Sequence, residues 1–283
     1  MNTQDAQPAA PDSSGPYRSP APVPCWLDYP LYLANHGLVA RLVPLDPHTL
    51  RLDLAAIAAA LGPRTRAVLL TQPGNPSGVL HTSEELRALA ELLAAAPSAP
   101  LLISDESHRD VRPDGQPFVW PANFASRCCL VHSFGKSLAL QGQRLGYIAV
   151  PARMPASREL AELFATLCRV TGFCTPTALM QLALGELLAC QPDWSVLRAR
   201  RARLLAALHA GGYEVPHADA TFFLYPRTQG GDDWAQAEAL AARGLLVLPA
   251  PVFHHRGHFR LALTCNDAML EHATRVLAGG AAA

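Results

Sequence analysis

The 283-residue sequence has almost no lysine: of its 23 lysine and arginine residues, 22 are arginine, and Lys136 is the only lysine. It also lacks a net charge, because 23 acidic residues balance the basic ones and the two kinds are interleaved along the chain. A chain without a basic patch has no electrostatic footprint for nucleic acid or for an anionic membrane surface. We therefore predict no nucleic-acid partner and no membrane partner.

Paired cysteines and long apolar runs near the start are missing as well. The seven cysteines show no CxxC spacing, which predicts reduced thiols in a cytoplasmic protein rather than disulfides or a zinc site. The histidines of HHRGH at 254–258 have no nearby carboxylate or cysteine, so we predict a solvated loop and no metal site. Residues 1–23 are rich in proline, alanine and serine, which predicts a disordered tail rather than a leader peptide.

After this tail the sequence becomes periodic. Short apolar runs bounded by turn residues are typical of strands that are covered on both faces. Helical patterns lie between them, with Asp53 and Thr82 as predicted N-caps. This alternation predicts an α/β fold with a mostly parallel sheet. The predicted strands are the runs at 38–45, 67–73, 101–105 and 128–134.

The pattern changes after residue 151, where three helical segments follow one another and strands then alternate with helices. We therefore expect a large domain at 24–175 and a smaller α+β domain at 176–283.

Lys136 stands directly after the strand predicted at 128–134. Arginine stays protonated at any accessible pH, whereas a lysine amine can lose its proton in a dry pocket and attack a carbonyl to form a Schiff base. Ligands bind at strand ends in parallel sheets. Position and chemistry therefore nominate Lys136 as a nucleophile, against the alternative of a single surface lysine in an arginine-rich sequence.

The segment from Ser133 to Tyr147, SFGKSLALQGQRLGY, resembles the cofactor-lysine segment of fold-type I, pyridoxal-phosphate (PLP) dependent aminotransferases of class I/II, the aspartate aminotransferase-like family. The resemblance implies PLP as the cofactor, a Schiff base on Lys136, and phosphate ligands at Ser133 and Arg144. A guanidinium fork with a hydroxyl donor suits a dianionic phosphate.

Four further segments follow the family's order. The resemblance implies that Asn75 of TQPGNPSG contacts the phenolic oxygen of PLP. It also implies that Asp105 of LLISD pairs with the pyridine nitrogen, so that the ring can accept electrons. Trp26 of PCWLDYP would stack on the ring, and Arg260 of HFRLALT would bind the substrate α-carboxylate. Each segment alone has an ordinary explanation as a turn or a strand end. That explanation does not account for five such segments in the family's order.

Two departures from the family pattern remain. His108 stands where most relatives have tyrosine three residues after the aspartate, and C–S lyases similar to cystathionine β-lyase share this histidine; we include His108 among the predicted cofactor-binding residues. The family also usually has about a hundred residues before the stacking aromatic residue, including a helix N-terminus that binds the phosphate. Here only the predicted tail precedes Trp26, so we expect an N-terminally shortened large domain.

These observations predict a PLP-dependent aminotransferase that transfers an amino group between an L-amino acid and a 2-oxo acid, with Lys136 as general acid and base. Two alternatives stay open: a PLP-dependent C–S β-lyase, which His108 favours, and a truncated, non-catalytic subunit, which the missing phosphate helix favours. A sheet with an unpaired apolar side also predicts self-association, so we expect a homodimer.

Overall fold

The structure is a computed structural model, and it describes residues 15–172, 175–190 and 193–279. Its central sheet has the strand order β3–β4–β5–β6. Three of these strands are parallel: β3 (Ala67–Thr71), β4 (Leu101–Asp105) and β5 (Cys128–Ser133). The last strand, β6 (Gly146–Ala149), is antiparallel to β5. The predicted α/β fold with a mostly parallel sheet is confirmed.

Residues 18–23 form the strand β1 (Arg18–Val23), in which all residues after Arg18 are buried. The prediction of a disordered tail over residues 1–23 is therefore wrong for this part, while residues 1–14 lie outside the described residues. β1 pairs in parallel with β2 (Val39–Pro44). The small Ser and Ala side chains that suggested low complexity are instead packed inside the molecule.

The two prolines of β1 explain why this strand is hard to recognise. Arg18 exchanges two backbone hydrogen bonds with Arg64 and Arg66, just before β3. The backbone groups of Pro20 and Pro22 point to the same edge of β1 as those of Arg18, because the direction of backbone groups alternates from residue to residue along a strand. Since proline has no N–H to donate, the ladder between β1 and β3 stops there.

Helices pack on the sheet through apolar faces. α2 (Leu54–Ala60) begins at the N-cap Asp53, whose side chain accepts from Ala56 N. α3 (Ser83–Ala95) begins at a complete capping box between Thr82 and Glu85. Both predicted N-caps are confirmed. The buried leucines of α3 pack against Val68, Leu70 and Leu102 of the sheet.

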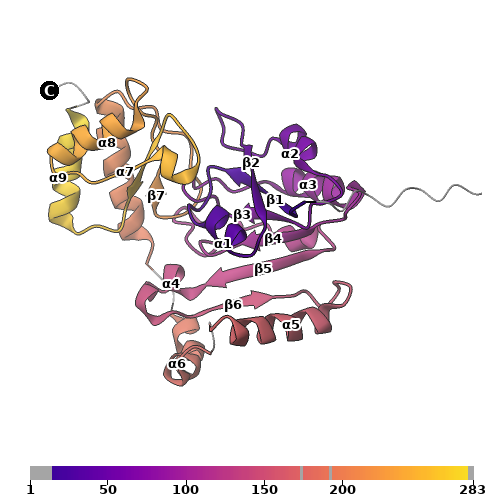
Figure 1. The fold of residues 1–283 in the computed structure, drawn as a ribbon. Helices are drawn as coiled ribbons and strands as arrows, with labels where there is room; N and C mark the ends of the chain where they lie inside the picture. The colour runs from indigo at the N-terminus through magenta and orange to yellow at the C-terminus, as the bar shows by residue number, and fades with distance from the viewer. Residues whose placement is uncertain (1–14, 173–174, 191–192, 280–283) are drawn as a thin grey trace, which may run out of the picture.

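The Lys136 segment forms the short helix α4 (Phe134–Ser137). Beyond β6 follow α5 (Ser157–Val170) and α6 (Ala178–Ala189), which lie at the lower end of the view in Figure 1. Met180 of α6 packs against Phe134 and Leu145. The division of the chain at residue 175 stays a prediction, and this packing favours a boundary between α6 and α7.

The C-terminal part has a core of its own, around α7 (Ser195–Ala210) and the three-stranded antiparallel sheet β7–β9–β8. Figure 1 shows its helices gathered away from α2 and α3. The remaining elements here are β7 (Phe223–Leu224), α8 (Asp233–Ala242), β8 (Leu248–Pro249), β9 (Phe259–Ala262) and α9 (Asp267–Ala278).

The described ranges contain no helix that combines the length and the hydrophobicity needed for a membrane span. They also contain no group of three or more histidine, cysteine, aspartate or glutamate side chains placed to hold a metal ion.

Candidate active site

The parallel strands bring their carboxyl ends to one edge of the sheet. Thr71, the last residue of β3, pairs in register with Asp105, the last residue of β4. Ser133 ends β5, and Lys136 follows one turn later in α4. The predicted lysine and aspartate therefore lie at the edge where parallel sheets bind ligands.

The Lys136 amine is half-buried, and its Nζ lies 5.9 Å from the ring centre of Phe222. Burial lowers its pKa, and the positive charge of Arg260 lowers it further, while the charge of Asp105 acts in the opposite direction. Two phenylalanine rings connect Lys136 to Arg260, because the Phe222 ring lies 4.7 Å from the Phe223 ring, which lies under the Arg260 guanidinium. A lowered pKa increases the fraction of neutral amine, which is the nucleophilic form.

The Asp105 carboxylate is held through both oxygens. Oδ1 accepts a hydrogen bond from Ser107 N at 2.9 Å. Oδ2 accepts one from the Tyr29 hydroxyl at 2.6 Å, and this hydroxyl lies 3.1 Å from Thr71 Oγ1. Burial and the charge of Asp105 raise the pKa of Tyr29 well above its ordinary value, so the phenol stays a donor. These contacts orient the carboxylate.

Tyr29 is the site residue that our sequence reasoning missed. It opens α1 (Tyr29–Asn35) and is buried beside Val23 and Cys25. A signal was present, because Tyr29 follows Trp26 by three residues, the spacing that brings two side chains to one side of a helical turn. Trp26 packs partly buried in the same apolar cluster. Its role as a stacking ring stays a prediction.

Arg260 lies on β9 and reaches across to the large domain. Its Nη1 donates to Asn75 Oδ1 at 3.0 Å. The guanidinium stacks over Phe223 at 4.0 Å and over Phe253 at 4.7 Å. Burial lowers its pKa to about 10, so it stays charged at neutral pH. It forms no ion pair with an acidic side chain within the described part of the chain, so it can bind a carboxylate.

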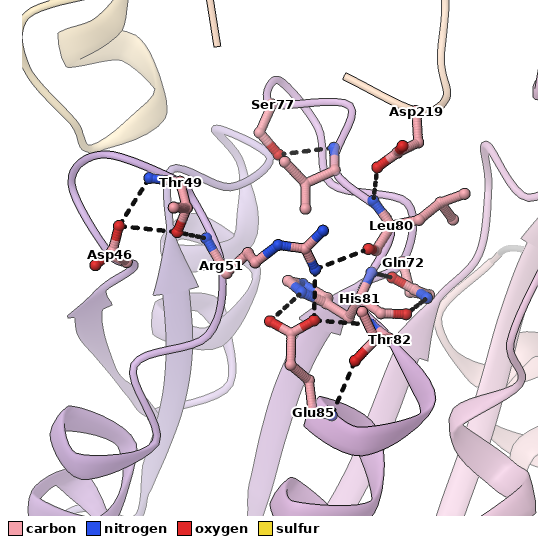
Figure 2. A network of polar contacts seen from close by, with 11 residues as sticks. Asp46, Thr49, Arg51, Gln72, Ser77, Leu80, His81, Thr82, Glu85 and Asp219 are labelled. Carbon is pink, nitrogen blue, oxygen red and sulfur yellow. Dashed lines mark hydrogen bonds and ion pairs between the residues drawn. The ribbon is translucent and has the colours of Figure 1, made fainter. Parts of the chain in front are cut away.

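The loop that carries Asn75 is fixed on one side by α3 (Figure 2). Gln72 and His81 exchange two hydrogen bonds, from Gln72 Nε2 to His81 O and from His81 N to Gln72 Oε1. Glu85 closes the capping box with Thr82 and binds Arg51 at 2.6 Å.

The C-terminal part fixes the same loop on the other side. Leu80 N donates to Asp219 Oδ2 at 3.3 Å, a contact also drawn in Figure 2. Gly78 O accepts the backbone N–H groups of Asp219 and Ala220. Asn75 therefore has a position set by both parts of the molecule.

His108 is buried against two phenylalanine rings, with ring centres 5.1 Å from Phe222 and 5.5 Å from Phe223. Burial lowers its pKa to about 3, with a smaller effect from the charges of Lys136 and Arg260. The imidazole is therefore neutral, with one N–H donor. Its Nδ1 is buried and has no hydrogen-bond partner among the described residues. A buried polar atom without a partner, next to Lys136, is suited to form a hydrogen bond with a polar ligand.

Ser133 and Arg144 line a separate cavity of about 180 Å³ together with Gly135 and Gly146. Ser133 Oγ accepts from Gly135 N at 3.3 Å. Arg144 adopts the left-handed conformation, with φ at 53°, after a short turn at Gln141–Gln143. Its side chain is exposed and donates to Gln141 O at 3.1 Å. The turn brings a guanidinium and a hydroxyl to one hollow, which suits a phosphate.

The predicted residues thus converge, and their chemistry fits PLP. An amine with a lowered pKa, an oriented carboxylate, a buried amide and a neutral imidazole lie near one another, with a hydroxyl and a guanidinium at the adjacent hollow. The unpartnered Nδ1 of His108 is consistent with a ligand that contains polar atoms.

Comparison with curated proteins gives relatives that are themselves longer than the matched region. The probable aspartate/prephenate aminotransferase of Rhizobium leguminosarum bv. phaseoli is 25% identical, over 90% of this chain and 68% of its own length. The aromatic amino acid aminotransferase of Rhodococcus opacus is 34% identical, over 78% of this chain and 59% of its own length. The chain therefore spans about two thirds or less of these proteins.

Solved structures have the same fold. An amino transferase from Eubacterium rectale superimposes with a TM-score of 0.87 at 23% identity, over 93% of this chain and 67% of that one. The N-succinyldiaminopimelate aminotransferase from Mycobacterium tuberculosis gives a TM-score of 0.80 at 26% identity, over 93% of this chain and 71% of that one. A family model described as aminotransferase class I and II matches residues 20–277. This chain therefore belongs to the class I and II aminotransferase family.

Proposed function

We propose that the protein catalyses PLP-dependent transfer of an amino group between an L-amino acid and a 2-oxo acid. The observation that carries this proposal is the placement of the only lysine beside a carboxylate and an unpaired arginine. Lys136 Nζ lies 5.9 Å from the Phe222 ring, which packs on the Phe223 ring beneath Arg260, and the charges of Arg260 and Asp105 both act on its pKa. These are the groups needed to bind a carbonyl, to hold a ring-nitrogen proton and to bind a carboxylate.

PLP, when bound, supplies a ring that accepts the electrons released when a bond to the substrate Cα breaks. Lys136 would hold the cofactor through its Nζ until the substrate amine takes its place, and the released Nζ would then take the proton from Cα. Asp105 would keep a proton on the ring nitrogen. Ser133 and Arg144 would hold the phosphate, Trp26 would cover a ring face, and Arg260 would bind the α-carboxylate.

Asn75 and His108 would both donate hydrogen bonds to the phenolic oxygen. Asn75 Oδ1 accepts from Arg260, which leaves the amide NH₂ group free to act as a donor toward a ligand. His108 is neutral and carries one N–H donor. A pair of neutral donors can bind an anionic oxygen without adding a proton to it.

One observation bears on the C–S lyase alternative. A leaving thiolate is helped by an acid that can give it a proton, and an imidazole with a pKa of about 3 is not charged at neutral pH. The relatives described above are named as aminotransferases. Both points favour amino-group transfer.

We also propose a homodimer in a reducing, cytoplasmic environment. Exposed leucines on α5 and α6 support self-association. The cysteines of the described residues are all free thiols, which suits such a compartment.

Reductive trapping tests the proposal directly. Added PLP should give a visible absorption band, and borohydride should fix pyridoxyl on one peptide that contains Lys136. Because no other lysine exists, a competing label can fall only on the N-terminal amine. Lys136→Ala should lose the band and the formation of 2-oxo acid from amino acids. A label confined to the N-terminus, or cystathionine cleavage without amino transfer, would contradict the proposal.

A further inference from the structure

A second hollow, of about 410 Å³, opens beside Lys136 between α4, the end of α6 and the start of α7. Its volume falls in the range of small-molecule sites, about 300–1,000 Å³. The side chains on its walls are mostly apolar and come from five parts of the chain: Leu138, Leu187, Trp194, Leu197, Phe222 and Leu263. We call this hollow the apolar cavity.

The apolar cavity adjoins the groups assigned to the substrate. Phe222 forms part of its wall and lies 5.9 Å from Lys136 Nζ. The neighbouring ring of Phe223, 4.7 Å from Phe222, lies under the Arg260 guanidinium. A molecule with its carboxylate on Arg260 and its Cα at Lys136 therefore has the apolar cavity beside it.

The charges on the walls of the apolar cavity are few and of both signs. Two cations, Lys136 and Arg200, and one anion, Asp193, lie on the walls. Arg200 Nη2 is paired with Asp267 Oδ1 at 3.3 Å, while its buried Nε has no hydrogen-bond partner among the described residues. A second carboxylate of a substrate would therefore meet the like charge of Asp193 as well as the charge of Arg200, whereas an apolar side chain would meet mainly apolar walls.

We infer that the apolar cavity receives the side chain of the amino-acid substrate, and that this substrate class has a large aromatic or apolar side chain. The inference rests on the proposed function, because it takes Lys136 and Arg260 as the groups that hold the substrate. It goes beyond that function by selecting one substrate class. Burial of an aromatic ring against such walls is favourable in proportion to the apolar area removed from water.

Binding of unreactive acids separates this inference from catalysis. The probes are 3-phenylpropionate, propionate and succinate, which have no amine, and the measurement is isothermal titration calorimetry on PLP-loaded protein and on Lys136→Ala. 3-Phenylpropionate should bind roughly 10- to 100-fold more tightly than propionate because its ring leaves water. Succinate should bind no more tightly than propionate. Equal binding of the three acids, or no binding of any, would overturn the inference.

A substitution at the mouth of the apolar cavity provides the second measurement. Val196 lines it and is half-exposed, so Val196→Trp can fill the space without entering the core. This variant should reduce the preference for 3-phenylpropionate by about 10-fold, whereas Val196→Ala should keep it. Ala202→Trp is the matched control, because Ala202 is exposed on the same helix and does not line the apolar cavity.

The outcomes distinguish this inference from the proposed function. Selective binding of 3-phenylpropionate without any amino transfer would support the apolar cavity and contradict the proposed function. Amino transfer that prefers aspartate or alanine and does not respond to Val196→Trp would support the proposed function and overturn the inference.

Discussion

At the scale of single residues, the site depends on side chains that hold its charged groups in place. The sequence alone assigns no hydrogen-bond partner to the Asp105 carboxylate. In the fold, its Oδ2 accepts a hydrogen bond from the buried Tyr29 hydroxyl. Hydrogen bonds to a charged group contribute about 1.5–3 kcal/mol. Under the proposed function, Tyr29 would act on the cofactor through Asp105.

The first prediction follows from this bond. Tyr29→Phe keeps the ring packed beside Val23 and Cys25 but removes the donor to Asp105. PLP affinity, measured by titration of the visible band, should fall about 10-fold because part of the bond energy is lost. Tyr32→Phe is the control, since the exposed Tyr32 lies on the same helix and donates to Asp28 at 3.3 Å. Equal affinities of the two variants would remove Tyr29 from this role.

Glu106, the residue after Asp105, points to the other face of the sheet and is fully buried. Burial raises its pKa from 4.5 to about 7, although Ser104 at 3.1 Å and Arg109 at 3.2 Å both favour the ionised form. A carboxyl with a raised pKa binds its proton more tightly in the folded state. Its contribution to stability is therefore present at low pH and is lost as the pH rises through about 7.

The second prediction is a difference in pH dependence. Between about pH 5 and pH 8, the free energy of unfolding of the wild type should fall relative to that of Glu106→Gln, by roughly 3 kcal/mol. Urea unfolding at several pH values measures this difference. Glu91→Gln, at an exposed position on α3, should follow the wild type. If the free energies of unfolding of the wild type and Glu106→Gln changed in parallel over this pH range, Glu106 would be ionised in the folded protein.

At the scale of elements, the Asn75 loop connects the two parts of the molecule. Gly78 adopts the left-handed conformation with φ at 73°. A Cβ added there would lie 2.7 Å from Ala220 O and 2.8 Å from the Ala218 Cβ. The backbone of the loop and the segment before β7 are thus in contact, and only glycine allows this approach.

The third prediction uses a second glycine as its control. Gly115 has the same φ of 73°, but a Cβ there would meet nothing within 4 Å. Gly115→Ala should lose only the left-handed preference, about 1 kcal/mol, whereas Gly78→Ala should lose a further 1–3 kcal/mol or so through the clash. Denaturant unfolding gives both values. Gly78→Ala should also weaken amino-acid binding, because the partner of Arg260 moves with the loop. Equal losses at both glycines would contradict this account.

Elements were predictable where local rules agree with the fold. Asp53 and Thr82 are strong N-cap residues, and α2 and α3 begin at them. β1 was not predictable, because its two prolines argue against a strand. They are tolerated because the edge of β1 on which they lack an N–H donor is the edge where the hydrogen-bond ladder to β3 stops. The site was predictable in its residue types, but the contact of Tyr29 with Asp105 joins residues 76 positions apart and depends on the fold.

At the scale of the whole molecule, one end carries an apolar surface. α5 has no buried residue along its 14 residues, although Leu163 and Leu167 lie on it. α6 leaves Leu179 and Leu182 more than 70% exposed, at 75% and 83%. Figure 1 places both helices at the same end of the view, beyond β6. Several large apolar side chains left exposed at one end of a molecule are typical of an interface.

The last prediction tests the proposed homodimer at this surface. The wild type should sediment as a dimer at micromolar concentration, and Leu163→Glu with Leu182→Glu should sediment as a monomer. Burial of a leucine contributes about 1.5–3 kcal/mol, and each substitution occurs twice in a symmetric dimer, so the dissociation constant should rise at least 100-fold or so. Leu246→Glu is the control, because Leu246 is 84% exposed but lies between α8 and β8. Sedimentation velocity decides the matter: a monomeric wild type, or a double variant that remains dimeric, would show that α5 and α6 are not the surface through which two copies associate.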